Sequence, residues 1–291
     1  MNNMLQISQV IANIGILTFV VASMVALGLS LSVGQIVQPL RNGRLVVMTL
    51  LANFVLTPAL AFALKAVIPM DESYAIGLIL LATAAGAPFL PKLVQVAKGS
   101  AAISVGIMVL LMVTTIIYVP LVLPLLLPGV AVNPLDIAQS LVVLMLIPLA
   151  VGLFIKSRYS TVAESLQPPL AQISNVGLML GFVALLALSW RSLLSTIGSG
   201  AILATALLII GSFLIGWFLV SKEATLRPVF GLGTAQRNIA AALVVAGGNF
   251  DDPKVLVMCM VGSLLMLVIL MITAAELGKR VPLTTIYRSN Q

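Results

Sequence analysis

"GLGTAQRNIAAALVVAGG", residues 231–248, contains the feature that decides the fold of this chain. It belongs to an apolar run, residues 228–250, about as long as a bilayer crossing, yet its middle carries Gln236, Arg237 and Asn238. A charge at the centre of a membrane helix costs about 3 kcal/mol on insertion scales, so such a residue nearly always faces a cavity or a partner. The run therefore predicts an interrupted membrane helix rather than an ordinary one.

The composition sets this helix in a membrane protein. With 61% hydrophobic residues, 8% charged residues and a mean hydropathy of +1.20, the chain has too little polar surface to coat a water-soluble globule. A single cysteine excludes an intramolecular disulfide, and the lack of histidine excludes His-ligated metal and His-based catalysis. The net charge of +7 falls mostly in short loops between apolar runs, which indicates the lipid bilayer as partner and no nucleic acid.

The hydropathy pattern predicts an all-α polytopic fold of nine transmembrane helices. No hydrophilic segment exceeds roughly fifteen residues, so we expect no soluble domain, and the chain has no nucleotide-binding loop of the GxxxxGK[ST] kind. The nine predicted spans are residues 10–33, 44–66, 74–97, 100–126, 134–156, 171–189, 199–220, 224–248 and 253–278.

The basic residues predict the orientation, because loops on the cytoplasmic side carry an excess of Lys and Arg. With the N-terminus outside and the C-terminus in the cytoplasm, only Lys65, Arg191 and Lys254 lie on the outer side. We expect an integral protein of a bacterial inner membrane. The basic residues placed in or beside cytoplasmic segments are Arg41, Arg44, Lys98, Lys156, Arg158, Lys222, Arg227, Lys279, Arg280 and Arg288.

Two of the nine predicted spans are interrupted in the same way. The third, within residues 74–99, has Gly86, Pro88 and Pro91 in its second half, followed by Lys92. The eighth has two glycines before its polar triplet. Proline removes an amide donor and glycine weakens a helix, so both spans are predicted to unwind midway.

Unwound backbone at membrane depth is tolerated only where protein covers it or where it lines a cavity. A pair of interrupted spans at corresponding places in two halves of a chain is typical of secondary transporters with inverted repeats. We therefore expect helix breaks near residues 88–91 and 234–238, lying close together at the bilayer midplane.

The order of four motifs resembles the bile acid:sodium symporter family: "ANFVLTPALAF" at 52–62, "YAIGLILLATAAGAP" at 74–88, "AKGSAAISV" at 97–105 and "GLGTAQRNIAAAL" at 231–243. The resemblance implies two discontinuous helices that cross in a core domain beside a thinner panel domain. It also implies inverted repeats in a four-plus-five arrangement that lacks the family's first helix. The expected domains are panel 1–43, core 44–130, panel 131–195 and core 196–291.

The same resemblance implies sodium sites, and here the chain departs from the family. The family's ligand positions fall on four residues without a side-chain oxygen: Leu90, Pro91, Met108 and Gly231. Oxygen-bearing residues remain at Ser104, Gln236 and Asn53. Because a hard cation prefers five or six oxygens, we expect no bound sodium and no other cofactor.

The predicted substrate-binding residues are Asn53, Lys92, Ser104, Thr234, Gln236, Arg237 and Asn238. Arg237 has two possible roles: bidentate recognition of an anion, or neutralisation of the carbonyl ends of crossing half-helices. Lys92 either faces the site or extends to the cytoplasmic surface. Asn53 either contacts substrate or ion, or forms hydrogen bonds between helices.

These features favour a secondary transporter of a small organic anion that works by alternating access. One alternative is a conventional sodium-coupled symporter of such anions. Another is an ion or proton exchanger of the same fold, which the lack of Asp or Glu inside any predicted span disfavours. An intramembrane enzyme is disfavoured because the sequence shows no nucleophile paired with a base. The sequence leaves the substrate, the direction of transport and the oligomeric state open.

Overall fold

The computed structural model describes residues 2–32, 34, 41–127, 133–220, 223 and 226–280. Every regular element in these ranges is a helix, as the hydropathy pattern predicts. The elements are α1 (Asn2–Ser30), α3 (Gly43–Leu51), η2 (Ala52–Leu56), α4 (Thr57–Val67), α5 (Glu72–Thr83), α6 (Leu90–Val96), α7 (Ala101–Leu126), α8 (Pro134–Leu141), η3 (Val142–Leu146), α9 (Ile147–Arg158), α10 (Ser160–Leu194), α11 (Ala201–Ile215), η4 (Gly216–Val220), α12 (Arg227–Ala235), α13 (Ile239–Asn249) and α14 (Pro253–Arg280).

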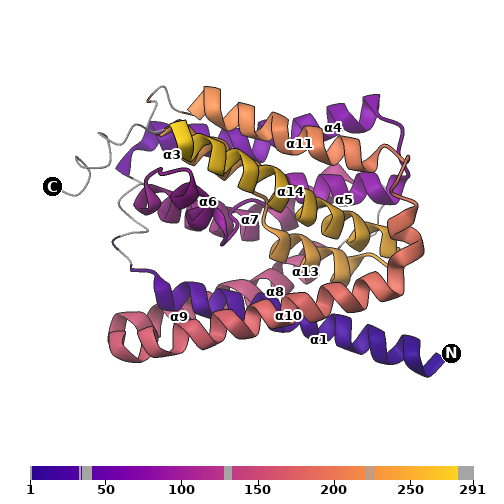
Figure 1. Ribbon diagram of the computed structural model, residues 1–291, viewed down its shortest axis with the longest axis horizontal. Coiled ribbons are helices and arrows are strands. Elements are labelled where there is room, and N and C mark those ends of the chain that lie inside the picture. Colours follow the sequence, from indigo (N-terminus) through magenta and orange to yellow (C-terminus); the bar gives the residue numbers. More distant parts are fainter. Residues whose placement is uncertain are drawn as a thin grey trace.

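The helices lie roughly along one axis, and α1, α9 and α10 form a layer along one face of the molecule (Figure 1). The close approach of α1 and α10 depends on glycine, because a Cβ added at Gly15 would lie 2.5 Å from the backbone nitrogen of Gly181. The remaining helices form the thicker part of the molecule, which contains both helix interruptions.

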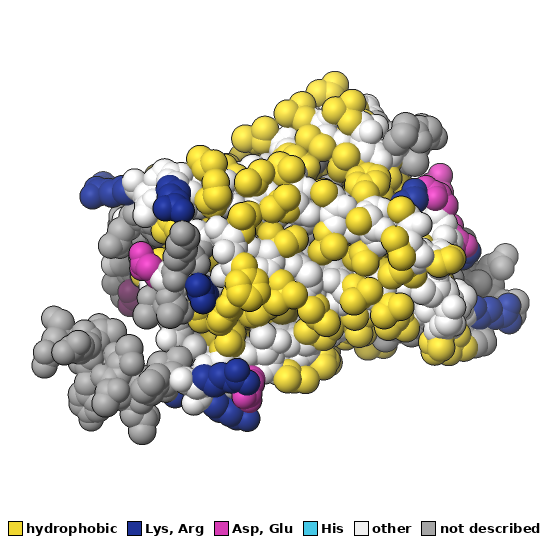
Figure 2. All heavy atoms as spheres, turned by 90° about the horizontal axis from the view of Figure 1, so that it is seen from above, with side chains coloured by type: hydrophobic (Ala, Val, Ile, Leu, Met, Phe, Trp, Pro, Cys, Tyr) yellow, Lys and Arg dark blue, Asp and Glu magenta, His cyan; other side chains and the backbone are white. Residues whose placement is uncertain are grey.

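Six helical stretches among the described residues are long and apolar enough to cross a membrane: 10–30, 43–67, 102–126, 134–158, 201–220 and 253–280. Hydrophobic side chains cover the middle of the surface in Figure 2, and charged side chains gather at its two ends. The chain is therefore an integral membrane protein.

The two ends differ in charge and are named here accordingly. The acidic end holds the start of α5 and of α14, with Asp71, Glu72, Asp251 and Asp252. The basic end holds the start of α3 and the end of α9, with Arg41, Arg44, Lys156 and Arg158. The helix α1 begins at the acidic end, and α14 finishes at the basic end (Figure 1).

Both predicted interruptions are present, and the first lies earlier than expected. Between α5 and α6 the helix is broken over residues 84–89, so Pro91 lies in the first turn of α6 rather than in the break. Proline is tolerated there because its missing N–H has no partner in the first turn of a helix. Between α12 and α13 the break covers residues 236–238.

One predicted span is much shorter than its helix. The hydropathy pattern indicates residues 171–189, whereas α10 covers Ser160–Leu194 and continues through Pro168 and Pro169. Its first turns are polar and mostly exposed, so a window that measures only apolar character does not detect them.

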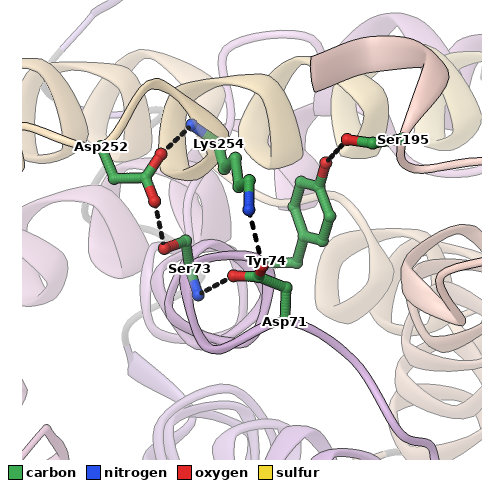
Figure 3. A network of polar contacts seen from close by, with 6 residues as sticks. All are labelled: Asp71, Ser73, Tyr74, Ser195, Asp252 and Lys254. Carbon is green, nitrogen blue, oxygen red and sulfur yellow. Dashed lines mark hydrogen bonds and ion pairs between the residues drawn. The ribbon is translucent and has the colours of Figure 1, made fainter. Parts of the chain in front are cut away.

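A polar network joins three elements at the acidic end (Figure 3). Asp71 caps the N-terminus of α5 by accepting a hydrogen bond from the Ser73 amide, and it forms an ion pair of 2.6 Å with Lys254 of α14. The hydroxyl of Tyr74 is hydrogen-bonded to that of Ser195, just after α10. The network therefore fixes the starts of α5 and α14 and the end of α10 relative to one another.

The ion pair predicts how stability depends on pH. The hydrogen bond that Lys254 donates to the Asp71 carboxylate holds the pKa of Asp71 below the usual 3.8. Because the pKa of Asp71 is lower in the folded than in the unfolded protein, the ionised carboxylate stabilises the fold at any pH above the pKa of the unfolded protein. This contribution is lost as the pH falls through the pKa of the folded protein. We expect Lys254→Met to lower the thermal stability at pH 6, and the difference from wild type to shrink below about pH 4. A difference that stays constant down to pH 3 would contradict this assignment.

Candidate functional site

The two helix breaks meet and satisfy each other's backbone. Both segments are extended, and Ala85 and Arg237 form an antiparallel bridge. The amide of Asn238 donates to the Ala84 carbonyl at 2.8 Å, and its side-chain nitrogen donates to the Gly86 carbonyl at 3.0 Å. Polar groups released by the interruptions thus find partners in the opposite break, as buried backbone requires.

Arg237 is 1% exposed and fills the space between the two broken helices. Its guanidinium donates four hydrogen bonds of 2.7–2.9 Å, which use four of its five N–H donors. The acceptors are the Leu81 and Ala82 carbonyls in the last turn of α5, the Thr234 carbonyl in the last turn of α12, and Asn53 Oδ1. Since helix C-termini carry partial negative charge, this geometry favours the neutralising role.

The positive charge of Arg237 is not matched by a carboxylate in the described part of the chain. The ion pairs there involve other basic residues, and all four acceptors of its guanidinium are neutral oxygens. Carbonyl dipoles stabilise the cation but leave a full unit of charge in place. The electric field of this charge therefore extends into any adjacent cavity.

Asn53 connects Arg237 to the helical stretch of α3 and η2 and to α12. Its Oδ1 accepts from the guanidinium at 2.9 Å, while its Nδ2 donates to the Thr49 carbonyl and, at 3.4 Å, to Thr234 Oγ1. Hydrogen bonding between helices, one of the two roles that the sequence left open, is thus the one observed in this structure.

A π-helical turn places Asn53 in this position. Pro58 cannot donate to the carbonyl of Phe54 four residues earlier, and that carbonyl accepts from the Tyr118 hydroxyl at 2.7 Å instead. Such turns commonly occur next to prolines and at functional sites.

Asn238 has a structural role at the start of α13. Its Oδ1 accepts from the Ala241 amide at 3.1 Å and so caps this half-helix. Gln236 differs from its neighbours: it is 5% exposed, and its buried Oε1 has no hydrogen-bond partner among the described residues. Of the described side chains at the second break, Gln236 is the one with a buried acceptor that has no partner.

A cavity of about 650 Å³ lies between the breaks and the layer of α1 and α10. Among the described residues that line it, Arg237 is the one with a charge. The lining consists of Phe19, Ser23, Ala26, Leu27 and Ser30 of α1; Gln167, Ala171, Ser174, Asn175, Leu178 and Met179 of α10; Ala87, Pro88, Phe89, Gln236, Arg237, Ile239 and Ala240 at or beside the breaks; and Ser263, Leu264 and Leu267 of α14. Most of this surface is apolar.

Five of the seven predicted site residues are brought together: Asn53, Thr234, Gln236, Arg237 and Asn238. Lys92 is not among them, because it lies exposed on α6 and does not line the cavity. Ser104 is buried on α7 rather than at either break.

Sequence reasoning missed three contributors to the site. Thr115 of α7 accepts from the Ala85 amide and donates to the Ala85 carbonyl, at 2.9 and 3.0 Å, so its hydroxyl alone satisfies that residue's backbone. The isolated hydroxyls in an apolar span are a signal that could have found it. The Leu81 and Ala82 carbonyls have no side-chain signal.

Residues 16–196 match the model of the sodium bile acid symporter family. The chain belongs to this family. A search of curated proteins gives no match for the chain. Membership in the sodium bile acid symporter family confirms the resemblance seen in the sequence and makes this a transporter-family protein. The matched range includes the first break and ends before α11.

Of the four positions at which the resemblance places sodium ligands, Leu90, Met108 and Gly231 are buried in this member of the sodium bile acid symporter family. Leu90 and Met108 are fully buried in one hydrophobic cluster. A Cβ at Gly231 would lie 2.9 Å from the ring of Phe213, so a longer ligand there would need this ring to move. Because the side chains at these positions are apolar, only backbone carbonyl oxygens there could bind a cation.

Proposed function

We propose that this protein is a secondary transporter that moves a small organic anion by alternating access without sodium coupling. The observation that carries the proposal is the buried, uncompensated charge of Arg237 beside a 650 Å³ cavity between two layers of helices. A central cavity at the meeting point of two broken helices is where such transporters bind their substrates.

The proposed architecture has nine crossings in a four-plus-five inverted repeat. An odd number of crossings is supported by α1 and α14, whose free ends lie at opposite ends of the molecule (Figure 1). The panel comprises residues 1–43 and 131–195, the core 44–130 and 196–291. With the acidic end outside and the basic end in the cytoplasm of a bacterial cell, the N-terminus is external, in accord with the excess of basic residues at the other end.

In this proposal the guanidinium of Arg237 takes the place of a bound cation. Three carbonyls and one amide oxygen surround it, which is the kind of oxygen set that sodium uses. A tethered cation cannot leave with the substrate, so it stabilises the breaks permanently and cannot couple transport to an ion gradient.

The proposed substrate is an anion with an apolar body. Arg237 acts on it mainly through its electric field, because most of its donors are already used. The Gln236 Oε1 accepts a hydrogen bond from a hydroxyl or amide donor elsewhere on the substrate, since the carboxylate itself has no proton to donate. Ser23 and Asn175 provide polar contacts from the opposite layer. The largely apolar lining accommodates its hydrocarbon part.

The test compares binding with and without sodium. Purified protein is screened by thermal shift against amphipathic carboxylates, including a bile acid, and the best binder is titrated in sodium and in choline buffer. We expect the two dissociation constants to agree within about twofold, since each tenfold change would require about 1.4 kcal/mol of coupling. A gain of about tenfold or more in sodium would contradict the proposal and favour the sodium-coupled symporter.

A further inference from the structure

A second cavity, of about 670 Å³, lies at the basic end and shares no lining residue with the candidate site. It is a groove between α3 and the first three turns of α7, with Phe230 of α12 beside them. The lining residues are Arg41, Asn42, Gly43, Leu45, Val46, Thr49, Ser100, Ala102, Ile103, Ile107, Leu110 and Phe230.

The groove has the dimensions of one membrane leaflet. On α7 its lining runs from Ser100 to Leu110, which corresponds to about 15 Å at 1.5 Å per residue. The hydrocarbon core of a bilayer is roughly 30 Å thick, so this length is about half of it. Exposed Val47, Val113 and Ile117 on the same two helices show that this side of the molecule presents apolar side chains outward.

Polarity changes along the groove in the same sense as along a phospholipid. Leu45, Val46, Ile103, Ile107 and Leu110 line its body, whereas Arg41, Asn42 and Ser100 lie at its mouth. Arg44 and Lys98, next to lining residues in the chain, are exposed at the same end. None of the described residues that line the groove is acidic. Basic pockets between membrane helices bind anionic lipid headgroups by this complementarity.

We propose that this groove binds one anionic phospholipid, with its phosphate at Arg41 and an acyl chain along α3 and α7. The bound lipid also reaches the elements that hold the helix breaks. Thr49 lines the groove, and its carbonyl accepts from the Asn53 side chain that binds Arg237; Phe230 lies on α12, whose last turn binds the same guanidinium. Occupancy of the groove therefore stabilises the candidate site from its far side.

The experiment uses the full chain in a neutral detergent. Native mass spectrometry and thermal shift are recorded with phosphatidylglycerol, with phosphatidylcholine of the same acyl chains, and with inorganic phosphate. We expect one phosphatidylglycerol per chain, bound at least about fivefold more tightly than phosphatidylcholine, and no stabilisation by inorganic phosphate.

Two groove variants and one control complete the test. Arg41→Ala removes the headgroup contact and Ile103→Trp fills the acyl groove, and each should weaken phosphatidylglycerol binding about fivefold or more. Arg158→Ala removes an exposed arginine at the same end, outside the groove, and should bind like wild type. Equal affinity for both lipids, equal loss in Arg158→Ala and Arg41→Ala, or equal stabilisation by phosphate would each overturn the proposal.

Discussion

Replacing Arg237 with alanine is expected to destabilise the protein severely. The substitution leaves the Leu81, Ala82 and Thr234 carbonyls and Asn53 Oδ1 buried without their common donor. Each buried group left unsatisfied costs about 1–3 kcal/mol, so we expect the free energy of unfolding to fall by about 3 kcal/mol or more. Denaturant or thermal unfolding in lipid nanodiscs measures the loss, which should be accompanied by loss of transport.

Two further variants separate architecture from substrate binding. Arg237→Lys keeps the charge but cannot reproduce the planar set of donors, so we expect it to recover stability only in part. Gln236→Ala removes an oxygen that has no partner within the described structure, so it should keep wild-type stability and weaken binding of the best carboxylate. A stable Arg237→Ala protein that has lost only substrate affinity would instead show that the guanidinium binds the anion directly.

A second large effect is expected from Gly86→Ala, in the first break. Gly86 has a φ of +80°, and an added Cβ would press on the backbone nitrogen of Met112, closer than real Cβ atoms approach. The backbone of α7 cannot give way as a flexible side chain can, and the Gly86 carbonyl also accepts from Asn238. We expect a loss of about 3 kcal/mol or more, from backbone strain and steric clash together.

Gly198→Ala is the matched control for this substitution. Gly198 has nearly the same φ, +82°, but an added Cβ there meets nothing within 4 Å. It should therefore show the conformational cost alone, about 1 kcal/mol in the same unfolding assay. Equal losses in the two variants would mean that the contact with α7 contributes nothing to the stability of the first break.

The second break could be predicted closely because its signal lies in the chain itself. A central cation needs protein around it, and the sequence places Arg237 between two polar amides after two glycines. The first break is marked by prolines, and proline is equally acceptable in the first turn of a helix. Prolines alone therefore could not show whether the break includes Pro91 or ends before it.

The partners of Arg237 could not be predicted, because carbonyl groups occur at every position of the chain and give no pattern. The face of α6 on which Lys92 lies could not be predicted either. It follows the first break directly in sequence, but the rotation of the short helix α6 about its axis decides whether its side chain points inward, and the structure leaves it exposed.

The polar network at the acidic end has a consequence for the transport cycle that we propose. The cavity is lined by the second half of α1 and the first half of α10, whereas Tyr74, Ser195 and the pair of Asp71 and Lys254 lie beyond their other halves. In the proposed cycle this is the inward-facing conformation, and the Tyr74–Ser195 hydrogen bond is the one of these contacts that joins the proposed core to the proposed panel. Opening of the acidic end in that cycle breaks this partly buried hydrogen bond, whereas the Asp71–Lys254 ion pair lies within the proposed core and can stay intact.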